Sequence, residues 1–398
     1  MSKRARTSPT SPTSSSSLRP SSTSNTTTTT TTTTTRTPTY PTAASTTGTL
    51  AELSAIPGAS IFTCDPNALS HRFAFVTAYD GTAFHGWQKQ SNAKDTVQAY
   101  VEKRLSSLFG RPCTTIVNGR TDGGVHSNGT VFHLDLDKSE IQRVARMYKV
   151  PAATTKEDDN DVTPLHRAAL ALQLTLRRSI RVLQEDIQVL RVYPVSHHFH
   201  ARMSCVGKRY VYNIHEGYPM PLEVRACWSL HGKRLDVDAM EETAAMLVGV
   251  HDFTVFGRTP NFSSGQEPHH LDARSPVRCV HMLHIHRVPL NNPSAADNEF
   301  SNTNTNTNTF GRVRITCEAD FFLWNMCRRL VGLLVQVGLH IVTPAQVSKH
   351  LGTTFNVLTD NAIKQKFVMT APAKGLCLDQ VFYDSNGAGG FANEPFKV

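Results

Sequence analysis

The chain has 398 residues, 39% of them hydrophobic, and a formal net charge of +9 at pH 7. That length suits two domains, or one large domain with tails. None of the eight cysteines belongs to a C-x-x-C pair, which argues against a zinc ribbon or a redox dithiol. No apolar run is long enough to cross a bilayer, and the N-terminus lacks the apolar segment of a signal peptide.

The first 68 residues differ in composition from the rest of the chain. They include an unbroken Thr run from Thr26 to Thr35, and residues 1–50 contain five Lys or Arg and no acid, so they carry +5 of the +9 charge. Such a composition predicts a disordered tail, and it is typical of transit peptides to mitochondria or plastids. "KRAR", Lys3 to Arg6, fits a weak nuclear signal as well. An untargeted tail would leave the protein in the cytoplasm, so the localisation stays open.

The predicted elements of the first half begin near His71. Alternating residues in "RFAFVTAYDG" predict a strand that ends in a turn, and "TVFHLDLD" predicts another strand. An acidic loop, "TTKEDDNDVTP", follows and has the character of a solvated insertion. Apolar residues at helical spacing predict two helices, one through Val97, Val101, Leu105 and Leu108 and the other through Leu172, Leu176, Ile180 and Leu183.

The second half repeats this pattern in outline. Strands are predicted for "KRYVYNIH", "CVHMLHIHRV", "RVRITCEADFF" and "GLCLDQVFY". In the helix "DVDAMEETAAMLVG", Asp238 and Glu241 are spaced as a capping box. The low-complexity run from Asn302 to Thr309 is expected to be an enlarged hairpin loop. The stretch "LWNMCRRLVGLLVQVG" is expected to be a long helix with Met326, Leu330, Leu333 and Val337 on one face.

Strand, helix, strand and strand, twice over, predict an α+β fold of two similar halves. Each half is expected to contain a mainly antiparallel sheet with helices, and the two sheets to form a central sheet with a cleft between the halves. The predicted division is a tail at 1–68, an N-terminal half at 69–196, a C-terminal half at 197–385 and a C-terminal tail at 386–398.

The stretch "NGRTDGGVH" concentrates polar chemistry on one predicted turn. An Asp before two glycines is an ordinary turn, but a turn requires neither Arg120 nor His126 beside Asp122. Gly123 and Gly124 remove side chains where a planar ligand would approach the backbone. Asp122 is therefore a candidate for chemistry.

A second polar stretch is "FHARMSCVGKRYVYNI". The histidines just before and within it, in "HHFH", suggest a metal, but no further Cys, His or acid cluster completes a site. Tyr210 and Tyr212 are expected to share a face of a strand. Basic residues such as Arg202 and Lys208, alternating with aromatic residues, suit stacking on an unpaired base beside a phosphate backbone.

Two consecutive arginines, Arg328 and Arg329, follow the apolar entry "FFLWNM" of the long helix. An arginine that faced inward would require an anionic partner. Periodicity alone favours a solvent-exposed pair.

Five motifs in this order resemble the tRNA pseudouridine synthase family of the TruA type and its eukaryotic relatives. They are "YDGTAFHGWQKQ", "GRTDGGVH", "FHARMSCVGKRYVY", "FLWNMCRRLVGLLVQVG" and "TAPAKGLCL". The second is the most specific, since the family form is GRTDxGVH, and its GVH version resembles the bacterial and organellar branch. The resemblance spans roughly His71 to Tyr383, and neither the tail nor the two insertions interrupts a motif.

The resemblance implies a pseudouridine synthase fold and isomerisation of uridine in tRNA, in the anticodon stem-loop at positions 38–40. It assigns Asp122 as the catalytic carboxylate, which either attacks the sugar carbon or deprotonates the sugar. Tyr210 would stack on the uracil and take its C5 proton, and Arg328 would pair with Asp122. Arg120 would occupy the place that the flipped base leaves. Substrate contacts are also expected from His126, Arg202 and Lys208.

The family needs no metal, nucleotide or redox cofactor, so none is expected. The expected partners are tRNA and a second copy of the chain, because family members are homodimers whose tRNA site spans both subunits; no membrane partner is expected. Two alternatives stay open on the residues alone. One is a synthase that acts on messenger or ribosomal RNA, and the other is an idle RNA-binding or tRNA-folding protein on the same scaffold.

Overall fold

A computed structural model describes residue 64 and residues 68–91, 95–147, 164–181, 186–217, 226–257, 276–288, 311–351 and 369–383. Most of the predicted tails, the acidic insertion, the Asn-Thr run and Leu183 lie outside the described residues. No helix in the described ranges is long and apolar enough to span a membrane.

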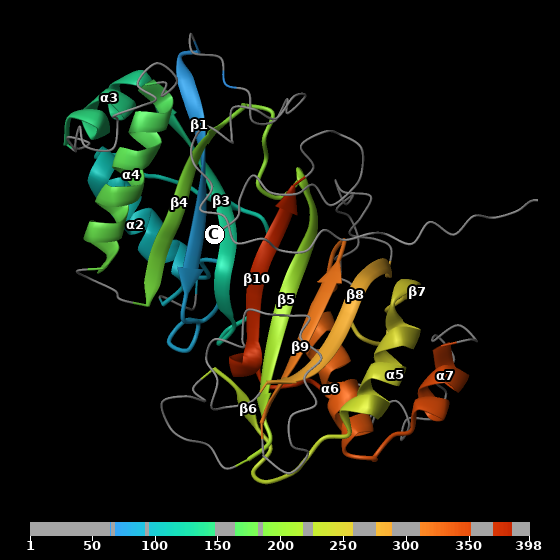
Figure 1. Cartoon of the computed structure of the whole chain (residues 1–398). Coiled ribbons are helices and arrows are strands. Elements are labelled where there is room, and N and C mark those ends of the chain that lie inside the picture. The colour runs from blue at the N-terminus through green and yellow to red at the C-terminus, as the bar shows by residue number, and fades with distance from the viewer. Residues whose placement is uncertain are drawn as a thin grey trace, which may run out of the picture. The chain divides into compact units, whose positions relative to one another are not determined.

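One ten-stranded sheet organises the described residues (Figure 1). Its main path runs β4-β1-β3-β10-β5-β9-β8-β7, with β2 beside β3 and β6 beside β5. Pairing is antiparallel except at β10 with β3 and at β5 with β6. The mainly antiparallel central sheet with helices confirms the predicted α+β fold class. The predicted boundary at 196/197 falls in the loop between β4 and β5.

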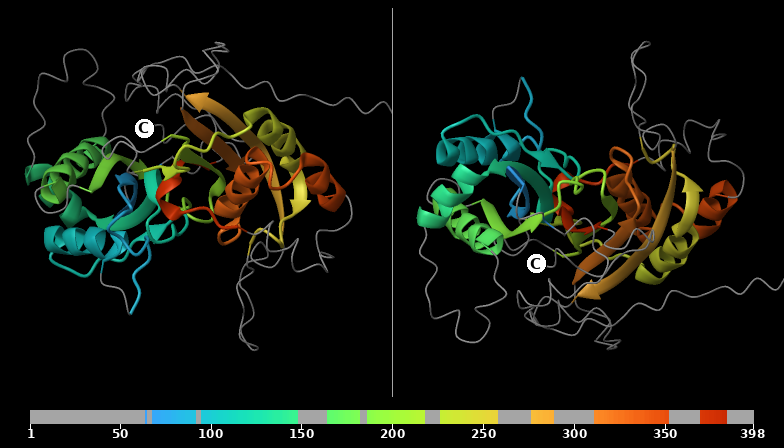
Figure 2. Two further views of the ribbon diagram at one scale, coloured as in Figure 1. Left: turned by 90° about the horizontal axis from the view of Figure 1, so that it is seen from below. Right: turned by 90° about the horizontal axis from the view of Figure 1, so that it is seen from above.

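The strands before that loop are β1 (Ser70–Tyr79), β2 (Ile116–Val117), β3 (His126–Asp137) and β4 (Ile187–Val195). The helices of this part are α2 (Val97–Phe109), α3 (Lys138–Met147) and α4 (Pro164–Arg181). They lie together beside β1 and β4 (Figure 2). Thr96 begins α2 by accepting a hydrogen bond from the Ala99 amide, and Gly110 ends it with φ 70°.

The strands after the loop are β5 (Cys205–His215), β6 (Trp228–Ser229), β7 (Gly249–Asp252), β8 (Val277–Val288), β9 (Arg312–Ala319) and β10 (Leu376–Tyr383). The helices are α5 (Val237–Leu247), α6 (Met326–Gly338) and α7 (Pro344–Leu351), and the 3-10 turn η5 (Ala373–Gly375) precedes β10. These three α-helices form a second group beside β8 and β9 (Figure 1).

One detail of the predicted helices is wrong. The N-cap of α5 is Asp236, whose carboxylate accepts from the Ala239 amide at 3.0 Å. Glu241 instead contacts the Ile285 amide and the His284 ring on β8, so the box at Asp238 does not form. Helix α6 has more than one buried face, because Cys327, Val331 and Leu334 are buried as well as the predicted stripe. It is enclosed on nearly all sides, where periodicity carries little information.

Candidate active site

Asp122 lies on a short turn that leads into β3, which we call the carboxylate turn (residues 118–126). Asn118 holds the start of this turn, because its amide donates to the Val131 carbonyl at 2.8 Å and its side-chain oxygen accepts from the Val131 amide at 3.0 Å. The Val125 amide donates to the Asp122 carbonyl at 3.2 Å. Gly124 adopts φ +77°, a conformation that favours glycine. The backbone thus determines where the Asp122 side chain begins.

The motif "YDGTAFHGWQKQ" forms a second loop that packs against the carboxylate turn. A Cβ atom on Gly86 would lie 2.5 Å from the Thr121 carbonyl oxygen, and one on Gly81 would lie 2.0 Å from the Val125 carbonyl oxygen. Only glycine permits such close approaches. Backbone bonds join the loops, from the Gly124 amide to the Phe84 carbonyl at 3.2 Å among others. The first motif therefore supports the second.

Donors to the Asp122 carboxylate come from the segment that enters α6, which we call the helix entry (residues 322–328). Arg328 Nη1 lies 3.4 Å from Asp122 Oδ2, although the two residues are 206 positions apart in the chain. Arg328 is fixed by two further acceptors, Ala371 O at 2.8 Å and Asn325 Oδ1 at 3.2 Å. The expected solvent-exposed pair is wrong, because Arg328 is only 19% exposed and Arg329 reaches the Val255 carbonyl.

The second donor to Asp122 is Trp324, which sequence reasoning did not single out. Its indole Nε1 lies 3.1 Å from Asp122 Oδ1. Asn325 follows with φ 63°, in the left-handed region that Asn tolerates better than most residues. The available signal was the spacing: Trp324 precedes Arg328 by four residues within one motif, close to one helical turn.

The two tyrosines of β5 occupy different surroundings. Tyr210 is buried, and its ring packs edge-on against Phe322 with centroids 4.9 Å apart. Burial raises the pKa of Tyr210 well above its usual value, and nearby Cys327, Tyr79 and Asp122 add to the effect. Tyr212 instead donates its hydroxyl proton to the Pro372 carbonyl at 2.7 Å. Of the two, Tyr210 is the residue close to the carboxylate.

His126 is directed into the protein. Its Nδ1 lies 3.1 Å from the Gly81 nitrogen and 3.0 Å from Asp80 Oδ1, and its Nε2 lies 3.1 Å from the Lys374 carbonyl oxygen. Both ring nitrogens are thus in contact with protein atoms. The residue connects the carboxylate turn with the supporting loop and with η5, while its predicted substrate contact stays a prediction.

Three of the predicted basic residues lie near the same turn. Arg120 and Arg202 are both exposed side chains. Partial desolvation of the Arg202 guanidinium and the nearby charge of Arg120 lower the pKa of Arg202. The Lys208 ammonium packs against Gly119, where a Cβ atom would lie 2.4 Å from its nitrogen. Burial, with a smaller effect from Arg202, lowers the pKa of Lys208. Within the described ranges these three cations form no salt bridge, so they can accept an anion from outside the chain.

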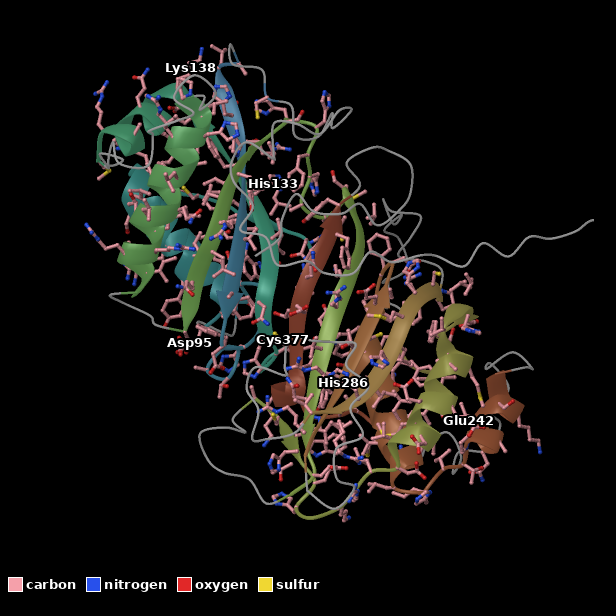
Figure 3. All side chains as sticks on the ribbon, viewed as in Figure 1. Asp95, His133, Lys138, Glu242, His286 and Cys377 are labelled. Carbon is pink, nitrogen blue, oxygen red and sulfur yellow. The ribbon has the colours of Figure 1, made fainter. Side chains whose placement is uncertain are left out.

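The histidines of "HHFH" make contacts that fix the loop before β5. His197 Nε2 lies 2.7 Å from the Ser70 carbonyl oxygen, and His200 Nδ1 accepts from the Arg202 and Met203 amides. The His200 ring packs against His133, which lies on β3 (Figure 3). In the part of the chain that the structure describes, no three His, Cys, Asp or Glu residues gather as metal ligands would.

A carboxylate held by two donors lies beside a buried tyrosine, near cations that form no salt bridge within the described ranges, and this arrangement suits an enzyme that acts on a phosphate-bearing substrate. A sequence model described as tRNA pseudouridine synthase matches residues 243–384. The tRNA pseudouridine synthase A of Methylococcus capsulatus is 33% identical over 314 residues, 78% of this chain and 89% of that protein. The enzyme of the same name from Paramagnetospirillum magneticum is 31% identical over 318 residues, 79% of this chain and 96% of that protein.

The chain therefore belongs to the tRNA pseudouridine synthase A family. The resemblance that the five motifs carry is confirmed, and the protein is a pseudouridine synthase, an isomerase.

Proposed function

We propose that this protein converts uridine to pseudouridine in the anticodon stem-loop of tRNA, at positions 38–40, and that Asp122 is its catalytic carboxylate. The observation that carries the proposal is the pair of hydrogen bonds to the Asp122 carboxylate, in which Arg328 and Trp324 each contact one oxygen. The names of the relatives support tRNA as the substrate. The stem-loop position is carried over from the family.

The reaction rearranges the nucleoside without adding or removing atoms. The bond from N1 of uracil to C1′ of the ribose breaks, the base rotates, and a bond from C5 to C1′ forms. The C5 proton leaves, and N1 ends protonated. The Asp122 carboxylate starts this sequence either by attacking C1′ or by taking a proton from the sugar. Both routes require the ionised carboxylate, which a neighbouring guanidinium favours.

Tyr210 is proposed to stack on the uracil. Its ring is held from the side by Phe322, so one orientation is kept before substrate arrives, and stacking of this kind is worth about 1–3 kcal/mol per base. Because burial raises the pKa of Tyr210, its hydroxyl is protonated in the free enzyme. To take the C5 proton, the phenol must therefore first pass its own proton to another acceptor.

The basic residues are proposed to bind the RNA around the extruded nucleotide. A base has to leave the helical stack before its sugar can reach Asp122, and the exposed Arg120, two residues before Asp122, is suited to fill the gap. Arg202 and Lys208 have no salt-bridge partner in the described ranges, which suits contacts with the phosphates on either side. His126 would contribute indirectly, because its contacts with Gly81, Asp80 and Lys374 hold the carboxylate turn in place.

A homodimer is proposed from the family alone. Light scattering on the purified protein tests it, since the chain mass is 43.9 kDa and the dimer has twice that mass.

The activity is tested with tRNA that carries tritium at C5 of its uridines. Isomerisation releases the label into water, whereas an idle RNA-binding protein would bind the tRNA and release none. Pseudouridine mapping of total RNA, organellar RNA included, with and without this gene then tests the position. Loss of the modification at tRNA positions 38–40 supports the proposal. Loss confined to messenger or ribosomal RNA would support the alternative synthase.

A further inference from the structure

The two oxygens of the Asp122 carboxylate are held by partners of very different exposure, since Trp324 is 54% exposed and the Arg328 side chain 19%. We propose that Trp324 is a displaceable donor: it holds Oδ1 in the free enzyme and yields that oxygen to the ribose when the target nucleotide enters. Oδ1 is then the reacting oxygen, and Oδ2 stays with Arg328. This inference rests on the proposed role of Asp122 in pseudouridine formation.

Arg328 is built to stay in place. Its Nε donates to the Ala371 carbonyl at 2.8 Å and its Nη1 to Asn325 Oδ1 at 3.2 Å. Arg328 and Ala371 are also joined through their backbones, since the Ala371 amide donates to the Arg328 carbonyl at 3.0 Å. The two acceptors on Ala371 and Asn325 oppose any movement of the guanidinium away from Oδ2.

Trp324 is exposed where Arg328 is enclosed. It is 54% exposed, whereas Trp87, for comparison, is fully buried in the core. Its backbone lies in a β-bridge just before α6, so a displacement of the indole involves the side chain alone. A rotation of the indole about its side-chain bonds therefore removes little apolar surface from the core.

The chemistry of the two bonds also differs. A guanidinium is charged and stays with an anion, whereas the indole N–H is a neutral donor and its bond is the weaker kind. An oxygen that accepts a hydrogen bond is a poorer nucleophile and a poorer base than one that is free. Release of Oδ1 by the indole thus activates the carboxylate at the moment the sugar arrives. The released ring can stack on a base, as aromatic side chains commonly do in sites for unpaired nucleotides.

Other titratable groups near the carboxylate must be separated from it in any test of pH dependence. Arg328 faces it from α6 and Tyr210 from β5, and burial raises the pKa of Tyr210 well above its usual value, so Tyr210 keeps its proton throughout the acidic range. Cys327 lies beside Tyr210, and its hydrogen bond with Cys317, together with burial, raises the pKa of the Cys317 thiol. The His85 backbone lies against Gly123, so His85→Gln is the control for an imidazole.

The test compares two pH profiles of Trp324→Phe, which keeps an aromatic ring and loses the N–H. The acidic limb of kcat/KM reports the free enzyme, and that of kcat reports the enzyme with substrate bound. Losing a donor favours protonation of a carboxylate. We expect the kcat/KM limb to move to higher pH by about half a unit to one unit, while the kcat limb stays in place. His85→Gln should leave both limbs where they are in the wild type.

Arg328→Lys is the matched comparison, because Arg328 is proposed to hold its oxygen in both states. It should move both limbs. If Trp324→Phe also moves both limbs equally, the indole is a permanent partner and the inference is overturned. If it moves neither limb, the contact has no role and the inference is overturned as well.

Tryptophan fluorescence provides an independent readout. Adding tRNA should change the emission of the wild-type protein, and Trp324→Phe should lose most of that change; equal changes in the two proteins would contradict displacement. Asp122→Asn separates the proposed function of Asp122 from the proposed displacement of Trp324. If this variant still isomerises uridine, the proposed function of Asp122 fails. If it is inactive while Trp324→Phe keeps both wild-type pH profiles, only the displaceable donor fails.

Discussion

The carboxylate turn and the helix entry meet at Asp122, but they are built by different means. The turn is shaped by backbone: Gly81 and Gly86 allow the supporting loop to approach its carbonyl groups closely, and amide-to-carbonyl bonds join the two segments. The helix entry is shaped by side chains. The Trp324 indole donates to the Asp122 carboxylate, and the Arg328 guanidinium donates to the Asn325 side chain.

This difference separates two tasks of the site. Backbone contacts determine where the acid is, with little freedom to relax. Side-chain contacts determine which oxygen is held and how readily the acid is ionised, and they can be exchanged when substrate arrives. Damage to the turn should therefore give losses that do not depend on pH, whereas damage to the helix entry should give losses that do.

Asp122→Asn removes the group on which both regions act. We expect turnover to fall by at least ~10³-fold, because the amide is neither a nucleophile nor a base of useful strength. Affinity for tRNA should stay within about tenfold, since phosphate contacts dominate binding. Tritium release and a filter-binding assay measure the two quantities. Substantial isomerisation by the purified variant would contradict the assignment of Asp122.

Arg328→Met tests the helix entry. Without the guanidinium Oδ2 loses the charged donor that holds the carboxylate in position, so activity should fall by roughly 10²-fold, and the acidic limb of the pH profile should move to higher pH. Arg329→Met is the matched control, because the next arginine contacts the Val255 carbonyl instead; we expect near-normal turnover. A flat pH profile for Arg328→Met would show that Arg328 only positions the acid.

Tyr210→Phe tests whether the hydroxyl acts after the base has been rejoined. General-base assistance usually contributes ~10²–10⁴-fold, so the step that removes the C5 proton should slow by at least ~10²-fold, while stacking keeps substrate binding near normal. Tyr212→Phe is the control, because its hydroxyl contacts the Pro372 carbonyl. That variant should lose about 1 kcal/mol of stability and keep its rate. Rapid-quench kinetics would detect the accumulated intermediate, and the opposite pattern would show that Tyr212 is the reacting tyrosine.

Gly86→Ala tests the turn with the smallest change. The added Cβ meets the Thr121 carbonyl at 2.5 Å and the backbone has φ +87°, so we expect about 1–3 kcal/mol of lost stability and a loss of activity at every pH. Gly110→Ala has a similar φ, +70°, but nothing within 4 Å, and should cost only about 1 kcal/mol without changing kcat. Equal effects in thermal melts and activity would show that crowding at the turn is unimportant.

The sequence predicted most of what the backbone builds. Period-two alternation located β1 and β5, helical spacing located α2, and the dense motif around Asp122 indicated the acid. Prediction from the sequence failed where packing between distant segments determines the position of a side chain. Nothing in the periodicity of α6 shows that Arg328 and Arg329 are both drawn inward, because a helix enclosed on nearly all sides has no polar face to count. The left-handed Asn325 and the reach of Trp324 to Asp122 depend on contacts between distant parts of the chain, which local patterns do not contain.

The place of β10 in the sheet has a consequence for how the protein is made. This strand comes last along the chain but lies between β3 and β5, with Cys377 opposite His126 on one side and Val211 on the other. A growing chain on the ribosome therefore lacks the middle of its sheet until residues 376–383 have been synthesised. The final closure pairs segments about 250 residues apart, and such long-range pairing is slow. Until then β3 and β5 each have an unpaired edge, which is where association with another chain would begin. A product that stops short of Leu376 contains Asp122 but lacks the strand at the centre of its sheet.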